Sequence, residues 1–182
     1  MKNFTFVFLI FSFLSSDSLF PQVFPMYRGN SELTGVYNTQ AINKLDGVKF
    51  TFQTQGAIRS TPAIANGVAY FGSTDSYFYA IDAASGTEKW KFKTGGAIGS
   101  SPAVVNNVVW FSSRDGKLYA LDAASGNEIW KFQFGSDLGF NNLWDFYLSS
   151  PNIVDEILYI GSGDGNLYAI DILSKNVKWK FN

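Results

Sequence analysis

Aspartates that could serve as acids, bases or calcium ligands recur in this sequence at one fixed spacing. Asp82, Asp122 and Asp171 each precede a serine by three residues and a tryptophan by eight. A catalytic pair of carboxylates is needed once in a chain, whereas this arrangement occurs three times. Because a carboxylate at the start of a turn accepts backbone N–H groups of that turn, we interpret the three aspartates as structural.

The tryptophans that follow these aspartates define a repeat, because they are 40 and 49 residues apart. A period near 40 residues is typical of β units that bury their apolar faces on one another, here through the flat tryptophan ring. Gly86 and Gly126 supply a positive φ in the turn, and Lys175 replaces the glycine in the third copy, where we expect a strained or altered turn. The predicted structural motif comprises Asp82, Gly86, Trp90, Asp122, Gly126, Trp130, Asp171 and Trp179.

Each repeat carries four strand signals, of which the first covers residues 60–65, 100–105 and 149–154. Two-residue turns follow at 66–67, 106–107 and 155–156. Asn66-Gly67 is a strong hairpin signal because both positions need positive φ, whereas Asp155-Glu156 fits poorly and predicts another turn type. In the last strand of the first repeat, aromatic residues alternate with lysines, which indicates one buried and one solvated face.

Repeated units of four antiparallel strands predict an all-β fold, namely a partial β-propeller of three four-stranded antiparallel blades. We expect blades at about residues 53–94, 95–134 and 135–182, within a repeat domain of residues 45–182. Residues 48–52 resemble a further fourth strand in which Phe50 replaces the tryptophan. Closed propellers have four to eight blades, so three predict an open arc and not a closed ring. The arc is either a fragment of a longer propeller or a part that other chains complete.

The composition argues against several function classes. The chain has no histidine and no cysteine, which removes the commonest general base and metal ligand and any thiolate site. We therefore predict no enzyme, and no catalytic, cofactor-binding or metal-binding residue. A net charge of −1 without a basic stripe predicts no nucleic-acid partner.

The amino terminus predicts export to the periplasm or the extracellular space. A lysine, an apolar run over residues 4–14 and a cluster of serines are typical of a signal peptide, which we place at residues 1–18. The alternative, a membrane anchor, is disfavoured because the run is shorter than the ~20 residues of a span. No cysteine is present for a lipid anchor. Residues 19–44 are expected to form an irregular lead-in.

One junction between repeats is longer than the others and rich in aromatic residues. It runs over residues 135–151 and includes Phe140, Trp144, Phe146 and Tyr147. It is expected on the same ring face as the Asp-Gly turns, together with Arg59 and Arg114. We interpret it as a binding loop for a protein, peptide or other ligand; alternatively, its aromatics only pack over that face.

Three segments resemble the tryptophan-docking motif of the PQQ (pyrroloquinoline quinone)-like repeat family. They are Ala-Leu-Asp-Ala-Ala-Ser-Gly-Asn-Glu-Ile-Trp (120–130), Gly-Ala-Ile-Gly-Ser-Ser-Pro-Ala-Val (96–104) and Ser-Arg-Asp-Gly-Lys-Leu-Tyr-Ala (113–120). Residues 27–37 resemble the lead-in of exported members. The family includes quinoprotein dehydrogenases, the BamB-type outer-membrane assembly propeller and kinase sensor domains.

The resemblance implies the fold but leaves three functions open. The chain is expected to be a non-enzymatic scaffold or binding module whose partners are proteins, peptides or further blades of its own kind. The alternatives are a fragment of a PQQ-dependent dehydrogenase and a sensor propeller of a receptor. Such dehydrogenases resemble the chain in the tryptophan motif but add a vicinal cysteine pair and a calcium site of Glu, Asn and Asp. The cysteine pair is absent here, so PQQ is implied by resemblance only.

Overall fold

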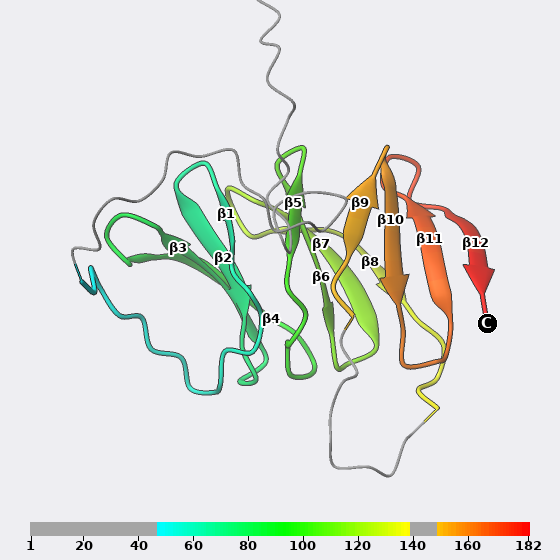
Figure 1. Ribbon diagram of the computed structural model, residues 1–182, viewed down its shortest axis with the longest axis horizontal. Coiled ribbons are helices and arrows are strands. Elements are labelled where there is room, and N and C mark those ends of the chain that lie inside the picture. The colour runs from blue at the N-terminus through cyan, green and yellow to red at the C-terminus, as the bar shows by residue number, and fades with distance from the viewer. Residues whose placement is uncertain (1–46, 139–148) are drawn as a thin grey trace, which may run out of the picture.

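The fold consists of three antiparallel four-stranded sheets that stand side by side (Figure 1). The computed structural model describes residues 47–138 and 149–182, and within these ranges it contains strands and turns but no helix. Each sheet is one blade, and the strands of each follow chain order from one edge to the other. The predicted all-β arc of three blades is therefore confirmed, and none of the sheets closes on itself. Blade 1 is β1 (Ala63–Ala65), β2 (Val68–Gly72), β3 (Tyr77–Asp82) and β4 (Glu88–Lys93); blade 2 is β5 (Ala103–Val105), β6 (Val108–Ser113), β7 (Lys117–Asp122) and β8 (Glu128–Gln133); blade 3 is β9 (Asn152–Val154), β10 (Ile157–Gly161), β11 (Leu167–Asp171) and β12 (Val177–Phe181).

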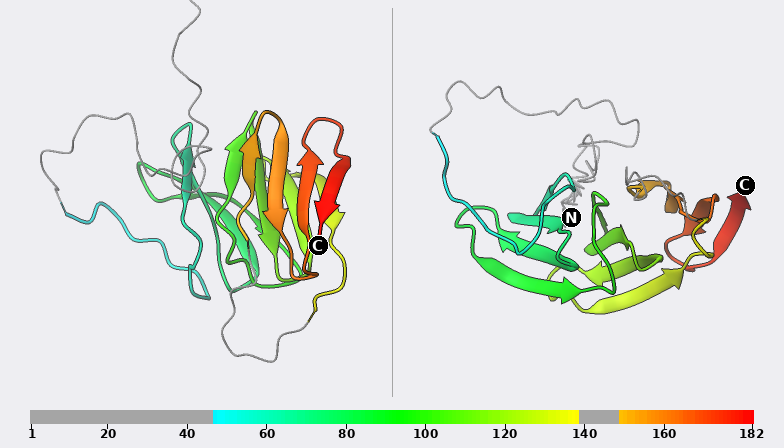
Figure 2. Two further views of the ribbon diagram at one scale, coloured as in Figure 1. Left: turned by 45° about the vertical axis from the view of Figure 1, so that its right-hand side comes forward. Right: turned by 90° about the horizontal axis from the view of Figure 1, so that it is seen from below.

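The blades fan out like sectors of a ring. Figure 2 shows their first strands on the concave side of the arc and their fourth strands on the convex side. The first strands begin at Ala63, Ala103 and Asn152, three residues later than the sequence predicts, because a proline just before each removes a backbone donor. All three blades carry the same register shift between the third and fourth strands, for example between Ala80 and Ile81.

The hairpin between the first two strands of each blade has the same backbone geometry. Its two turn residues have positive φ in blade 1 (Asn66 49°, Gly67 74°) and in blade 3 (Asp155 47°, Glu156 65°). The expectation of a different turn type at Asp155-Glu156 is therefore wrong. The paired strands β9 and β10 impose a two-residue connection, and the right-handed twist of such strands favours this turn even for residues that rarely adopt it.

Two apolar cores lie between the blades and join them. Phe78 of blade 1 stacks on Phe111 of blade 2 with ring centroids 4.0 Å apart, in a core that also contains Ile98. The core between blades 2 and 3 includes Leu118 and Leu158, both fully buried. Each blade thus buries its apolar face on its neighbour, as the repeat period predicts.

Residues 48–52 cover the other side of blade 1 without forming a strand. Phe50 and Phe52 pack against a cluster that contains Phe71 and Tyr79, and the Phe52 ring lies 5.5 Å from the Tyr79 ring. The prediction of a strand here is wrong, because these residues pair with no neighbouring strand among the described residues. The predicted equivalence of Phe50 to the tryptophans is confirmed. A Cβ on Gly86 would lie 2.5 Å from the Phe50 ring, and a Cβ on Gly126 would lie 2.6 Å from the Trp90 ring.

Candidate functional site

Each repeated aspartate at the end of a third strand accepts hydrogen bonds from the turn that follows it. Asp122 Oδ1 accepts hydrogen bonds from the Ala124 N–H at 3.1 Å, the Ser125 N–H at 2.8 Å and the Ser125 hydroxyl at 2.8 Å. Asp82 and Asp171 accept the same two backbone bonds in their turns. The serine bonds lower the pKa of all three carboxyl groups, so they stay ionised at neutral pH and are poor proton acceptors.

The tryptophan of one blade docks on the turn of the next. Trp90 Nε1–H donates to the Ala123 carbonyl at 3.1 Å, and the Tyr70 hydroxyl donates to the same oxygen at 3.0 Å. Gly126 has a φ of +75° and has the Trp90 ring directly above its Cα. A residue with a side chain at position 126 would be strained by the positive φ, and its Cβ would clash with the Trp90 ring. These two effects explain why glycine occupies this position.

The third copy keeps the shape of this turn without the glycine. Lys175 takes φ of +62°, and its N–H donates to the Asp171 carbonyl at 2.8 Å, the same length as the equivalent bonds of Gly86 and Gly126. The turn is therefore strained at Lys175 and not rearranged, since an L-residue in the left-handed region costs about 1–2 kcal/mol. Ile172 stands where blade 2 has Ala123.

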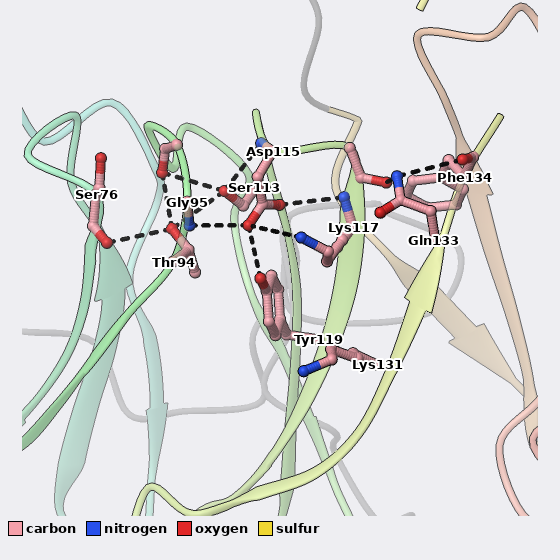
Figure 3. A network of polar contacts seen from close by, with 12 residues as sticks. Ser76, Thr94, Gly95, Ser113, Asp115, Lys117, Tyr119, Lys131, Gln133 and Phe134 are labelled. Atoms are coloured by element: carbon pink, nitrogen blue, oxygen red, sulfur yellow. Dashed lines mark hydrogen bonds and ion pairs between the residues drawn. The ribbon is translucent and has the colours of Figure 1, made fainter. Parts of the chain in front are cut away.

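A second set of aspartates links each blade to the segment that enters it. Figure 3 shows Asp115 Oδ2 accepting hydrogen bonds from the Tyr119 hydroxyl at 2.6 Å and the Gly95 N–H at 2.9 Å. The Lys117 ammonium lies 3.7 Å from the same oxygen. Gly95 follows the fourth strand of blade 1, so one carboxylate joins a turn, a strand and the previous blade. We name this arrangement the aspartate latch.

The latch occurs in all three blades. Asp75 accepts from the Tyr79 hydroxyl at 2.8 Å and the Gln55 N–H at 3.0 Å. Asp164 accepts from the Tyr168 hydroxyl at 2.5 Å and the Gly135 N–H at 2.8 Å. Burial alone would raise the pKa of Asp164, but the bonds from Tyr168 and its other donors lower it to about 2.

Asp115 and Asp164 lie in the turns that the sequence predicts, but the latch was not predicted. Its signal is an aspartate followed four residues later by a tyrosine, which occurs at the same point of every repeat. Burial, and then the hydrogen bond to the aspartate, raise the pKa of Tyr79, Tyr119 and Tyr168. These hydroxyls therefore donate at neutral pH and are not poised to act as bases.

The residues predicted for the binding face lie partly outside the described ranges. Arg59 of blade 1 and Arg114 of blade 2 are exposed, and the Arg114 N–H donates to the Ala97 carbonyl at 2.9 Å. Arg114 therefore lies where the Asp-Gly turn meets the entering segment, and its role in binding stays a prediction. The remaining predicted residues, Phe140, Trp144, Phe146 and Tyr147, fall outside the described residues, as do the signal peptide at 1–18 and the lead-in at 19–44.

Two other features, a metal-binding cluster and a membrane-spanning helix, are absent from the described residues. Residues 47–138 and 149–182 contain no group of three or more acidic side chains placed to hold a metal ion. The same ranges include no helix of the length and apolarity that crossing a membrane requires.

Solved structures confirm the fold. The chain matches BamB from Moraxella catarrhalis with a TM-score of 0.60 and 19% identity, over 72% of this chain and 38% of that protein. It matches a europium-containing methanol dehydrogenase with a TM-score of 0.65 and 21% identity, over 85% and 31% of the two chains. It matches the quinohemoprotein alcohol dehydrogenase ADHIIG from Pseudomonas putida HK5 with a TM-score of 0.59 and 25% identity, over 71% and 21%.

The similarity to these structures covers only part of each matched protein. The chain spans about a fifth to two fifths of the length of these proteins, so their activities do not transfer with the fold. No curated protein matches the sequence significantly. The family model described as outer membrane protein assembly factor BamB matches residues 38–182, which covers most of the chain. With its three four-stranded blades, the chain belongs to this BamB family of PQQ-like β-propeller repeats.

Proposed function

We propose that the chain is an exported, non-enzymatic β-propeller module that binds a protein or peptide. The main support is the use of its repeated carboxylates. Asp82, Asp122 and Asp171 bind their own turns, and the three latch aspartates bind the segments that enter their blades. Groups that are occupied in the same way in every blade are suited to holding the fold and not to one catalytic centre. The family's description as an assembly factor supports a protein partner.

The proposed binding face is the end of the blades that carries the latches. Three features meet there: the Asp-Gly turns, the segments between blades and residues 135–138, where the long junction begins. Arg59 and Arg114 are exposed near this end and supply positive charge. Loops on a rigid scaffold commonly carry binding residues, and aromatic and arginine side chains dominate binding energy at protein interfaces.

The proposal is tested by capturing partners from the cell envelope with the purified chain as bait. We expect a deletion of residues 140–147 to remove a protein that the unaltered chain captures. The matched control is Asn107→Gly, which lies in the hairpin at the other end of blade 2 and suits its φ of +61°. Identical sets of captured proteins for all three baits would contradict the proposed binding face.

Export is tested separately from binding. The chain is produced with its own leader, and its amino terminus is determined by mass spectrometry in the envelope and the cytoplasm. We expect cleavage near residue 18 and accumulation outside the cytoplasm. An uncleaved cytoplasmic chain would contradict this part of the proposal.

The second candidate is a piece of a PQQ-dependent dehydrogenase, and the similarity to two dehydrogenase structures favours it. The residues of this chain do not fit PQQ and its calcium ion. The chain has no cysteine, and its described residues gather no acidic cluster for a metal ion. We propose that the module binds neither PQQ nor calcium, and the titration described below tests this.

A further inference from the structure

The corner at which the fourth strand of one blade docks on the next blade differs between the two junctions of the arc. Between blades 1 and 2, the Ala123 carbonyl accepts two hydrogen bonds, from Trp90 Nε1–H at 3.1 Å and from the Tyr70 hydroxyl at 3.0 Å. Between blades 2 and 3, other residues occupy the corresponding positions of the same strands and turn. We name this region the docking corner of blade 3, and it is formed by Trp130, Trp110, Ile172 and Lys175.

Lys175 keeps Trp130 away from the turn on which it would dock. In blade 2, the Trp90 ring lies so close over Gly126 that a Cβ there would be 2.6 Å from it. Lys175 has the same left-handed backbone as Gly126, with φ of +62° against +75°, and it carries a Cβ at this point. Because carbon atoms pack at about 3.5–4.0 Å, Trp130 cannot lie on its turn as Trp90 does. Accordingly, the described part of the chain contains no hydrogen bond from Trp130 Nε1 to blade 3.

The docking corner of blade 3 also buries a donor without an acceptor. Trp110 is 2% exposed, and its Nε1–H has no hydrogen-bond partner among the described residues. Its ring lies in the apolar core between blades 2 and 3, with its centroid 6.0 Å from that of Trp130. A buried N–H that has lost water without gaining an acceptor destabilises the closed corner. Opening the corner returns water to this N–H, so opening is less unfavourable here than between blades 1 and 2.

The opposite end of the same junction is held by more hydrogen bonds. The strand β11 runs from the latch to the docking corner, so the two lie at opposite ends of blade 3. At the latch, Asp164 accepts from the Gly135 N–H at 2.8 Å, which joins blade 3 to the segment that leaves blade 2. The Ser112 hydroxyl of blade 2 adds a bond to the Ser149 carbonyl at 3.0 Å. This second bond has no counterpart between blades 1 and 2, because blade 1 has Gly72 at the position of Ser112.

We propose that the junction between blades 2 and 3 is a hinge that stays closed at the latch and opens at the docking corner of blade 3. Each blade keeps its own strand pairing in the open form, so the motion changes the curvature of the arc without unfolding a blade. Local openings of this kind occur where the fewest contacts have to be broken. The difference between the two junctions rests on side chains within the blades and does not depend on what precedes blade 1 or follows blade 3.

Single cysteines in a chain that otherwise has none report the opening through their rate of modification by a thiol reagent. Ile170→Cys probes the docking end of the core between blades 2 and 3, and Ile160→Cys probes the same core toward the latch. Leu121→Cys probes the position equivalent to Ile170 between blades 1 and 2, and all three native side chains are fully buried. We expect Ile170→Cys to react more than about tenfold faster than the other two variants, once global unfolding measured in urea is subtracted. Equal rates at 170 and 160, as fraying of the whole blade would give, or equal rates at 170 and 121 overturn the hinge.

Lys175→Gly in the Ile170→Cys chain tests the cause of the opening. It removes the Cβ that keeps Trp130 off its turn, so we expect modification to slow about fivefold, the equivalent of one regained hydrogen bond. The matched control is Glu156→Gly, which relieves a left-handed backbone with φ of +65° in the hairpin of the same blade and does not touch the docking corner. The control is expected to change the rate less than about twofold. Equal slowing by both glycines overturns the proposal, because it would show that backbone strain within the blade controls the opening.

Exchange of the indole N–H groups with deuterated water, followed by NMR on the unaltered chain, provides a second readout that needs no buried cysteine. The signals are assigned with the variants Trp110→Phe and Trp90→Phe. We expect the Trp110 N–H to exchange more than about tenfold faster than the Trp90 N–H, although Trp110 is the more deeply buried, because the hinge alone exposes it to water. Exchange of the Trp110 N–H that is as slow as that of Trp90, or slower, overturns the proposal.

Discussion

The docking of Trp90 on Gly126 makes a quantitative prediction about two glycine substitutions. Gly126 and Gly67 have nearly the same backbone angle, with φ of +75° and +74°. A Cβ at position 126 would lie 2.6 Å from the Trp90 ring, whereas a Cβ at position 67 would have no heavy atom within 4 Å. Alanine at either site therefore suffers the same backbone strain, and only alanine at 126 also displaces a ring.

The magnitudes follow from these two terms. The left-handed backbone costs an alanine about 1–2 kcal/mol, so we expect Gly67→Ala to lower the free energy of unfolding by that amount. Moving the Trp90 ring out to ordinary contact distance adds about 1–3 kcal/mol of overpacking. Gly126→Ala is therefore expected to cost about 2–5 kcal/mol in total.

Urea unfolding measures both variants, followed by tryptophan fluorescence and circular dichroism. Coincident transitions by the two probes justify the use of a single free energy. The difference between the variants isolates the ring contact, because the backbone term cancels. Equal losses at positions 67 and 126 would refute the docking of Trp90 on Gly126.

Three further perturbations test the repeated turns and latches. Lys175→Gly relieves the strained φ of the third turn and is expected to raise the free energy of unfolding by about 1 kcal/mol, measured by the same urea series; a loss would show that the turn is not strained. Trp90→Phe removes the bond to the Ala123 carbonyl, and a loss of about 1–3 kcal/mol is expected in thermal unfolding because that buried acceptor keeps only the Tyr70 hydroxyl. Asp164 has a pKa of about 2 in the folded chain against a reference of 3.8, so its contribution to stability is complete above about pH 4 and is lost as the pH falls from about 4 to about 2. Asp164→Asn should flatten this part of an acid-unfolding curve, and an unchanged curve would contradict the latch.

The fold could be predicted because its signals are local and repeated. The alternation of Trp90 and Phe92 with lysines gives the faces of a strand, and the period of about 40 residues gives the blade. The errors arose where the surrounding structure overrides local preference. Asp155-Glu156 and Lys175 adopt left-handed conformations because the strands on either side fix the length and shape of each turn. Residues 48–52 have the pattern of a strand, but the described part of the chain offers them no partner strand.

The candidate site could be predicted only in part. The turn aspartates were interpreted correctly as acceptors of their own backbone, because that contact spans three residues. The latch was missed because the Gly95 N–H that completes it lies 20 residues from Asp115, and its position is known only when two blades are in contact. Of the two donors in the latch, only the tyrosine, four residues after each aspartate, can be recognised from the sequence.

The central claim is that the repeated acids and tryptophans build a binding scaffold and no cofactor site. Titration of the purified chain with PQQ in the presence of calcium tests it most directly, with intrinsic tryptophan fluorescence and calorimetry as readouts. We predict no saturable change in fluorescence beyond the absorbance of the added PQQ, and no heat of binding. A saturable one-to-one signal in both readouts that disappears when calcium is removed would contradict the account.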